Sequence, residues 1–247
     1  MIIAVCNQKG GQGKTTTAQA IATGAAQIGR KSLAIDFDPQ GNLTFSMGGN
    51  GADVGAYELI TGKTTPGQTI QRTRQGDLIA ASSSLALADT TFTGEARINA
   101  LKTALKPIKN KYDVITIDCP PTLNTLLINA LTAADMVIIP LTADIYALQG
   151  LYQLKQSIEA AQKLNPGLQI GGVVFTRHST RTILSRDLTD VITDKCRELD
   201  DIPVYKTVIR EGVAVREAQT QRETLFTYAP KSKPAKDYMQ LIKEINL

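Results

Sequence analysis

The sequence contains few cysteines and a single histidine, and this scarcity narrows its possible chemistry. The three cysteines, Cys6, Cys119 and Cys196, are odd in number and show no CxxC spacing. We therefore expect neither a disulfide framework nor a zinc site, and a reducing cytoplasm fits this composition best. His178 is the one candidate for catalysis through a histidine base.

Long apolar runs are lacking too. No stretch approaches the roughly 20 apolar residues that cross a bilayer, and the apolar run 2–6 is too short for a signal peptide. We expect a cytoplasmic protein without a membrane partner. No linker, repeat or low-complexity tract divides the 247 residues, so one domain is expected over 1–247. The net charge of +4 suits binding to a polyanion but decides nothing alone.

Short runs rich in β-branched residues alternate with amphipathic helical patterns. This alternation predicts an α/β fold, with a mostly parallel, twisted sheet covered by helices on both faces. Ligands of such sheets bind at the carboxyl ends of the strands. The helical patterns cover residues 18–28, 147–164 and 184–192, and the expected strands cover residues 2–6, 32–35, 77–80, 114–117, 136–139, 170–175 and 204–209.

A glycine-rich loop follows the first expected strand and opens a helix, which predicts a P-loop NTPase. Its glycines let backbone N–H groups turn toward phosphates, while Lys14 would hold the β- and γ-phosphates and Thr15 a Mg²⁺ ion. The first glycine of the common P-loop pattern is replaced by Gln8. We expect ATP and Mg²⁺ as ligands, bound by Lys9, Gly10, Gly11, Gln12, Gly13, Lys14, Thr15 and Thr16.

The chain resembles the ParA-type ATPases, including their Soj branch, over nearly its whole length. The loop starts with Gln8 and Lys9, whereas the related MinD usually carries glycine at the position of Gln8. The segment 34–42 reads Ala-Ile-Asp-Phe-Asp-Pro-Gln-Gly-Asn and resembles the second motif of the family. The segment 112–121 reads Tyr-Asp-Val-Ile-Thr-Ile-Asp-Cys-Pro-Pro and resembles its Walker B segment.

A carboxylate beside such a loop can hold a Mg²⁺-bound water or orient the attacking water. Asp118 fits the first role, and the resemblance implies the second for Asp38, with Asp36 supporting the same group. For any one of these aspartates alone, a strand-end turn or helix-capping role is the alternative. The expected catalytic residues are Lys9, Lys14 and Asp38, and the expected metal residues are Thr15 and Asp118.

The resemblance also implies how such an ATPase works. Lys9 would reach across a nucleotide-sandwich homodimer to the phosphates of the partner, as an arginine finger does. Hydrolysis, slow without a stimulating ParB-like partner, would release the dimer. The segment 142–151 resembles the strand end before a dimer-side helix, and 176–182 resembles the segment near the adenine.

Dimers of ParA-type ATPases bind DNA without sequence preference, so nucleoid association is expected in the ATP state. Phosphate contacts need only reachable positive charge, but interleaved glutamates make a mixed, solvated surface an equal alternative. Many relatives carry arginine shortly before the Glu-Ala pair, where this chain has Ala214. The candidate DNA contacts are Arg210, Arg216, Arg222, Lys231 and Lys233, with Lys236 nearby.

Three classes of function remain open. The first is a DNA-segregation ATPase for a plasmid or chromosome. The second is a spatial regulator that positions another cargo, or a MinD-like membrane regulator, although the tail 236–247 has the pattern of a packed helix rather than a membrane anchor. The third is a metabolic or redox enzyme on the same loop, for which the sequence shows neither clustered cysteines nor a glutaminase segment.

Overall fold

The computed structural model describes residues 1–51, 54–94, 96–179, 183–198 and 202–247. Its centre is a seven-stranded sheet with the order β3-β4-β2-β5-β1-β6-β7. All neighbouring strands are parallel except β3, which runs antiparallel to β4 at one edge. The strands are β1 (Ile2–Val5), β2 (Ser32–Asp36), β3 (Ile70–Thr73), β4 (Gly76–Ile79), β5 (Val114–Asp118), β6 (Met136–Leu141) and β7 (Gln169–Phe175).

Helices cover both faces of the sheet because successive side chains of each strand point to opposite sides. In β1, Ile2 and Ala4 join one apolar core, whereas Ile3 and Val5 join the other. The first core also contains side chains of α3 (Ala56–Ile60), α5 (Ala88–Thr91), α6 (Ala96–Leu105), α7 (Thr125–Ala133), α8 (Ala147–Leu164) and α9 (Ile183–Glu198). The second contains side chains of α1 (Lys14–Gln27), α2 (Asn42–Ser46), α10 (Val213–Thr220), α11 (Leu225–Tyr228) and α12 (Lys233–Ile245).

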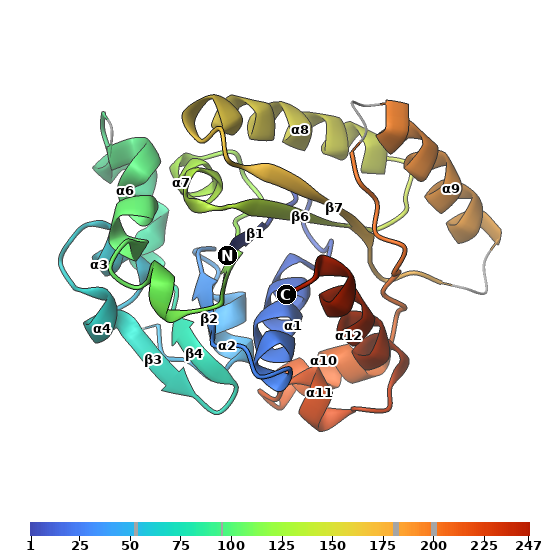
Figure 1. Ribbon diagram of the computed structural model, residues 1–247, viewed down its shortest axis with the longest axis horizontal. Helices are drawn as coiled ribbons and strands as arrows, with labels where there is room; N and C mark the ends of the chain where they lie inside the picture. The colour runs from blue at the N-terminus through green and yellow to red at the C-terminus, as the bar shows by residue number, and fades with distance from the viewer. Residues whose placement is uncertain (52–53, 95, 180–182, 199–201) are drawn as a thin grey trace.

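The two helical layers lie on either side of the sheet in Figure 1. Three short helices complete the described elements: α4 (Pro66–Thr69), η1 (Ser83–Leu87) and η2 (Lys109–Lys111). The predicted α/β class, with a mostly parallel sheet between helices, is therefore confirmed. Six of the expected strands are present with ends shifted by one or two residues, and β3 was not predicted.

The expected strand over 204–209 is wrong, although this segment does run beside β7. Its two ends bond to the sheet, since Tyr205 N donates to Val173 O at 2.9 Å and Ile209 N donates to Phe175 O at 2.7 Å. Between them, the N–H groups of Lys206 and Thr207 donate to the carboxylate of Glu244, at 2.6 and 3.0 Å. A continuous ladder cannot form because a carboxylate of α12 takes these donors.

The C-terminal helix α12 is packed, as its sequence pattern predicted, and the structure places it against α1. Tyr238, Leu241, Ile242 and Ile245 are all buried. Gly24 of α1 permits the close approach, because a Cβ there would lie 2.1 Å from Cδ1 of Ile242 and 3.1 Å from the ring of Phe226. Across the part of the chain that the structure describes, no helix combines the length and apolar character needed to span a bilayer.

Candidate nucleotide site

The loop between β1 and α1 takes its shape from two glycines with left-handed backbone. Gly11 has a φ of 73° and Gly13, the residue before α1, a φ of 80°. Residues other than glycine rarely adopt this backbone conformation, so the glycine spacing fixes the path of the loop. No side chain caps the start of α1 within the described residues. Its first N–H groups and the positive end of its dipole are therefore available to an anion.

Buried polar side chains hold this loop from below. Asn7 donates from Nδ2 to Pro140 O at 2.8 Å and accepts from Lys9 N at 2.9 Å. Gln12 accepts from Thr142 N through Oε1 at 2.7 Å, and its carbonyl accepts from the Thr176 hydroxyl at 2.9 Å. These bonds tie the loop to the ends of β6 and β7, so the loop is a preorganised cradle.

The two lysines of the loop lie in different environments. Lys14 is buried, with 8% of its surface exposed, and its Nζ donates to the carbonyl of Lys9 at 3.1 Å. The side chain of Lys9 is 39% exposed, and its Nζ lies 2.6 Å from Oδ2 of Asp144 and 5.6 Å from the ring centroid of Tyr146. Within one chain, Lys9 therefore has its own carboxylate partner before the α8 helix, while Lys14 stays under the loop.

Three aspartates stand at the carboxyl ends of β2 and β5, on the edge of the sheet that carries the loop. Asp36 and Asp118 are register partners in the parallel pair β2–β5, and Asp118 is also paired with Val5 just before the loop. Asp38 follows β2 by two residues and is 7% exposed. The structure thus brings all three predicted carboxylates to the phosphate loop.

Asp118 has the surroundings of a cation ligand. Both carboxylate oxygens are buried and have no hydrogen-bond partner among the described residues. Burial and, next, the charge of Asp36 raise the pKa of Asp118 well above its usual value, while the nearby Thr15 hydroxyl opposes this rise. A divalent cation would compensate a carboxylate that is desolvated and unpaired, so Thr15 and Asp118 fit a Mg²⁺ ion.

Asp36 has a supporting role in the structure. Its Oδ2 accepts both the backbone N–H and the hydroxyl of Thr44 at 2.7 Å, and its Oδ1 accepts the N–H of Asp38 at 3.3 Å. Asp36 thereby joins α2 to the end of β2 and orients the residue that follows. Burial is the main cause that raises its pKa to about 6, against the hydrogen bonds from Thr44.

The raised pKa of Asp36 predicts a pH dependence of stability without nucleotide or Mg²⁺. Between about pH 4 and 6 the folded protein keeps a proton that the unfolded chain, with a pKa of 3.8, has released. The free energy of unfolding should therefore fall as pH rises through this window, by up to about 3 kcal/mol. Urea unfolding at pH 4, 5, 6 and 7 measures this fall. An Asp36→Asn variant should lack this contribution. If the free energies of unfolding of the two proteins differed by the same amount at every pH, the assignment to Asp36 would be wrong.

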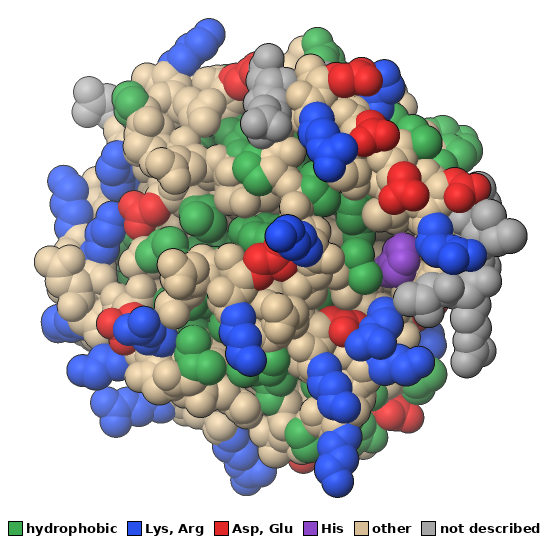
Figure 2. Space-filling model, turned by 45° about the vertical axis from the view of Figure 1, so that its right-hand side comes forward, with side chains coloured by type: hydrophobic (Ala, Val, Ile, Leu, Met, Phe, Trp, Pro, Cys, Tyr) green, Lys and Arg blue, Asp and Glu red, His purple; other side chains and the backbone are tan. Residues whose placement is uncertain are grey.

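The predicted DNA contacts lie in the layer formed by α10, α11 and α12. Figure 2 shows Lys and Arg side chains gathered over the lower part of one face, where Figure 1 places these helices. Arg216, Arg222, Lys231 and Lys233 are exposed. Arg210 differs, because its Nε and Nη2 donate to the two carboxylate oxygens of the buried Asp237 at 2.8 and 2.5 Å. This pair fastens α12 to the segment beside β7, so Arg210 has a structural partner.

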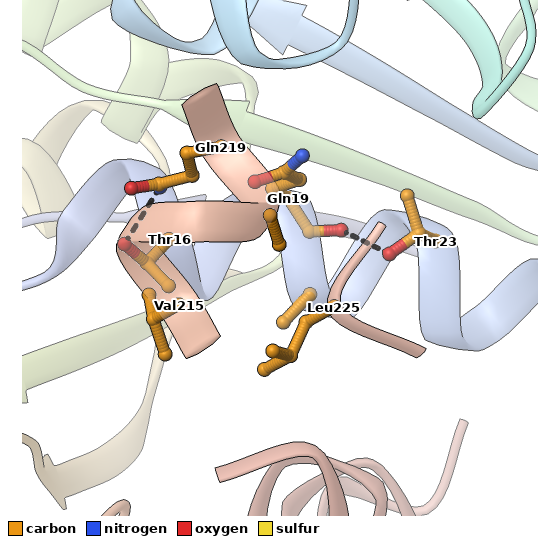
Figure 3. Close-up of a pocket in the computed structure, with 8 residues that line it drawn as sticks. Thr16, Gln19, Thr23, Val215, Gln219 and Leu225 are labelled. Atoms are coloured by element: carbon orange, nitrogen blue, oxygen red, sulfur yellow. Dashed lines mark hydrogen bonds between the residues drawn. The ribbon is translucent and has the colours of Figure 1, made fainter. Parts of the chain in front are cut away.

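The layer formed by α10, α11 and α12 contacts the first turn of α1, which directly follows the phosphate loop. Nε2 of Gln219, on α10, donates to the hydroxyl of Thr16 in the first turn of α1 at 3.0 Å. Figure 3 shows this bond beside a small cavity between α1 and α10–α11, which is also lined by Gln19 and Leu225. The helix that carries Arg216 therefore contacts the helix that begins at the phosphate site.

The sequence pattern did not reveal several residues of the site: Asn7, Thr44, Asp144 and Gln219. Asn7 carries a signal, since it is a polar residue between a buried strand and the loop. The partners of Asp144 and Gln219 are distant in sequence, while Thr44 bonds to Asp36 eight residues earlier. Thr176, in the segment expected near the adenine, lies under the loop against Gly13 and bonds to Gln12. Arg181 and Thr182 of that segment lie outside the described residues.

Comparison with known proteins agrees with this geometry. Residues 1–170 match a family model described as AAA domain. The chain is 40% identical to the sporulation initiation inhibitor protein Soj of Bacillus subtilis, over 99% of this chain and 97% of that protein. It is 36% identical to the chromosome partitioning protein ParA of Caulobacter vibrioides, over 99% and 93%.

Among solved structures, the chain is similar to the cobyrinic acid a,c-diamide synthase of Mycobacterium smegmatis with bound ATP analog and magnesium. The TM-score is 0.85 at 33% identity, over 98% of this chain and 92% of the other. That structure has the same fold as this chain and holds the two ligands that the loop predicts.

Proposed function

The chain belongs to the ParA/Soj-type ATPases, and from this premise we propose that it is an ATP-dependent DNA-partition ATPase. ATP binding would join two copies into a sandwich dimer that binds DNA without sequence preference. Hydrolysis, stimulated by a ParB-like partner, would return the dimer to monomers. One observation carries the proposal: the half-buried Lys9 and the buried Lys14 lie at the two ends of one glycine-rich loop, beside three carboxylates at strand ends.

In this proposal the loop binds the phosphates of ATP. The free N–H groups at the start of α1 and the Nζ of Lys14 would hold the phosphate oxygens. Thr15 and Asp118 would hold Mg²⁺, which when bound neutralises charge on the phosphates. The bonds of Asn7 and Gln12 to β6 keep the cradle in shape, so little reorganisation is needed when ATP binds.

Asp38 and Lys9 would act on the reaction itself. Asp38 is held beside the site because its own N–H bonds to Asp36 and its Oδ1 accepts from Gln40 N at 3.0 Å. We assign to it the positioning of the attacking water. Lys9 would leave Asp144 when two copies meet and would neutralise the charge that develops on the phosphates of the partner. Because this contact forms only in the dimer, it links hydrolysis to assembly.

DNA binding would follow from the exposed cations of the α10–α12 layer. Arg216, Arg222, Lys231 and Lys233 support it, since a dimer doubles the number of phosphate contacts and each contact adds counterion release. ADP lacks the γ-phosphate that favours the dimer, so hydrolysis would also end tight DNA binding.

A MinD-like membrane regulator is less well supported. An interfacial anchor needs a free apolar helix face, whereas the apolar side chains of α12 are buried against α1. An ATPase that positions a cargo other than DNA would differ from a DNA-partition ATPase only in the protein that stimulates hydrolysis. Identifying that protein distinguishes the two functions, since it is bound to DNA in one case and to the cargo in the other.

The mass of the protein in solution tests the assembly step. Light scattering of the wild type should give a dimer with ATP and Mg²⁺ and a monomer with ADP. Lys14→Ala should stay monomeric with either nucleotide, because it lacks the buried cation under the phosphates. A wild-type mass that is the same with ATP and ADP would refute the proposed switch.

A further inference from the structure

Arg222 occupies a backbone position that normally belongs to glycine. It follows α10 with a φ of 54°, and Glu223 N closes the end of that helix by donating to Ala218 O at 2.9 Å. This left-handed position after a helix is usually glycine because a Cβ is strained there. An arginine in a strained position points to a use for its side chain.

The side chain of Arg222 rests on an exposed aromatic ring. Its guanidinium carbon lies 4.5 Å from the centroid of Phe45, which is 52% exposed on α2. Stacking fixes the plane of the guanidinium and leaves the N–H groups at its edge free to donate. Within the described ranges, no carboxylate forms an ion pair with Arg222. Its charge is therefore presented outward.

The backbone of Arg222 is held by the turn between β3 and β4. Gln75, which is 7% exposed, donates from Nε2 to Arg222 O at 2.9 Å and to Ser46 O at 2.6 Å. Its Oε1 accepts from Gln19 of α1 at 2.8 Å. Arg74 precedes Gln75 in this turn and is exposed. Two cations from distant parts of the sequence are thus placed at one junction of α1, α2 and α10.

One residue of this junction, Phe45, is also close in sequence to the nucleotide site. Phe45 directly follows Thr44, whose N–H and hydroxyl both bond to the carboxylate of Asp36. The ring under Arg222 is therefore next in sequence to the residue that joins α2 to Asp36, the last residue of β2. A surface in this place is built on the same framework as the site that binds ATP.

We propose that Arg222 seated on Phe45, together with Arg74 of the adjoining turn, contacts the phosphate backbone of duplex DNA. This inference rests on the proposed function. It moves the DNA surface from α10–α12 alone to a junction with α2 and the β3–β4 turn, in a chain that has Ala214 where many relatives have arginine. A stacked guanidinium offers the two parallel N–H donors that match a phosphate.

The test compares variants of the full chain with ATP and Mg²⁺ on a fluorescent duplex of arbitrary sequence, across a salt series. Arg222→Gln should weaken binding at least tenfold and lower the slope of log K against log[salt] by about one per lost contact. Arg222→Lys should retain most of the slope. Arg197→Gln, an exposed arginine paired with Asp194 on α9, is the matched control and should bind as wild type.

Arg222→Gly separates contact from folding. Glycine relieves the left-handed strain, so its thermal midpoint should be no lower than that of Arg222→Gln, while its DNA binding should be equally weak. Unchanged affinity and slope in both variants would overturn the inference. The inference would also be overturned if Arg222→Gln kept its affinity for DNA but lost binding to anionic phosphatidylglycerol vesicles.

Failure of this inference differs from failure of the proposed function. If the wild type binds DNA more tightly with ATP than with ADP, and Arg222→Gln behaves identically, only the Arg222 contact is wrong. If the wild type binds no DNA in any nucleotide state, the proposed function itself fails.

Discussion

Replacing Lys9 by alanine is expected to lower ATP hydrolysis by about 1,000-fold, the effect of removing a charge supplied across an interface. Affinity for ATP should change little, because Lys14 and the start of α1 remain in place and Lys9 is bound to Asp144 in the single chain. Single-turnover hydrolysis and calorimetric titration with ATP measure the two quantities separately.

Asp144→Asn is the matched control for Lys9. It removes the carboxylate partner of Lys9 within its own chain and leaves the lysine itself intact. If Lys9 acts on the partner, hydrolysis by this variant should stay close to wild type or rise, because Lys9 is released more easily. If Asp144→Asn loses as much activity as Lys9→Ala, the ion pair itself is needed and the cross-dimer role is wrong.

Replacing Asp38 by asparagine is expected to slow hydrolysis by about 10²- to 10⁴-fold, the range for loss of a carboxylate that positions or deprotonates water. The dimer should still form with ATP, since Lys9, Lys14 and Asp118 are unchanged. DNA should consequently be held longer than by the wild type. Phosphate release and the lifetime of the DNA complex after dilution measure the two effects.

Asp190→Asn, at an exposed position of α9, is the control for Asp38 and should change neither quantity. The diagnostic result for Asp38→Asn is slower hydrolysis together with a longer lifetime of the DNA complex. A variant that loses DNA binding together with hydrolysis would show that Asp38 is needed to build the site. A variant with normal hydrolysis would remove Asp38 from the reaction.

The phosphate loop could be predicted in detail because its geometry is encoded locally. The sequence predicted a glycine-rich turn that opens a helix, and the structure shows left-handed backbone at Gly11 and Gly13 with Lys14 as the first residue of α1. The strand order places Asp118 beside the loop, since β5 is the neighbour of β1. The strand-end carboxylates could therefore be predicted from their positions after expected strands together with the motifs that resemble those of the family.

Other parts depended on residues that are distant in sequence. The carboxylate that holds Lys9 is Asp144, 135 positions away. The segment 204–209 has the apolar pattern of a strand, but Glu244 takes its central donors. Arg210 has the sequence context of an exposed cation, yet Asp237 binds it bidentately. In each case a long-range polar contact overrides a local pattern, and no periodicity reports such a contact.

The most direct test of the central claim is the affinity of the wild type for duplex DNA at one fixed salt concentration, measured with Mg²⁺ and either ATP or ADP. ATP should tighten binding by at least tenfold, about 1.4 kcal/mol, because in the proposed switch only the ATP state places two basic surfaces on one dimer. Lys14→Ala should show the weak affinity with both nucleotides. Equal affinity of the wild type with ATP and ADP would contradict the account.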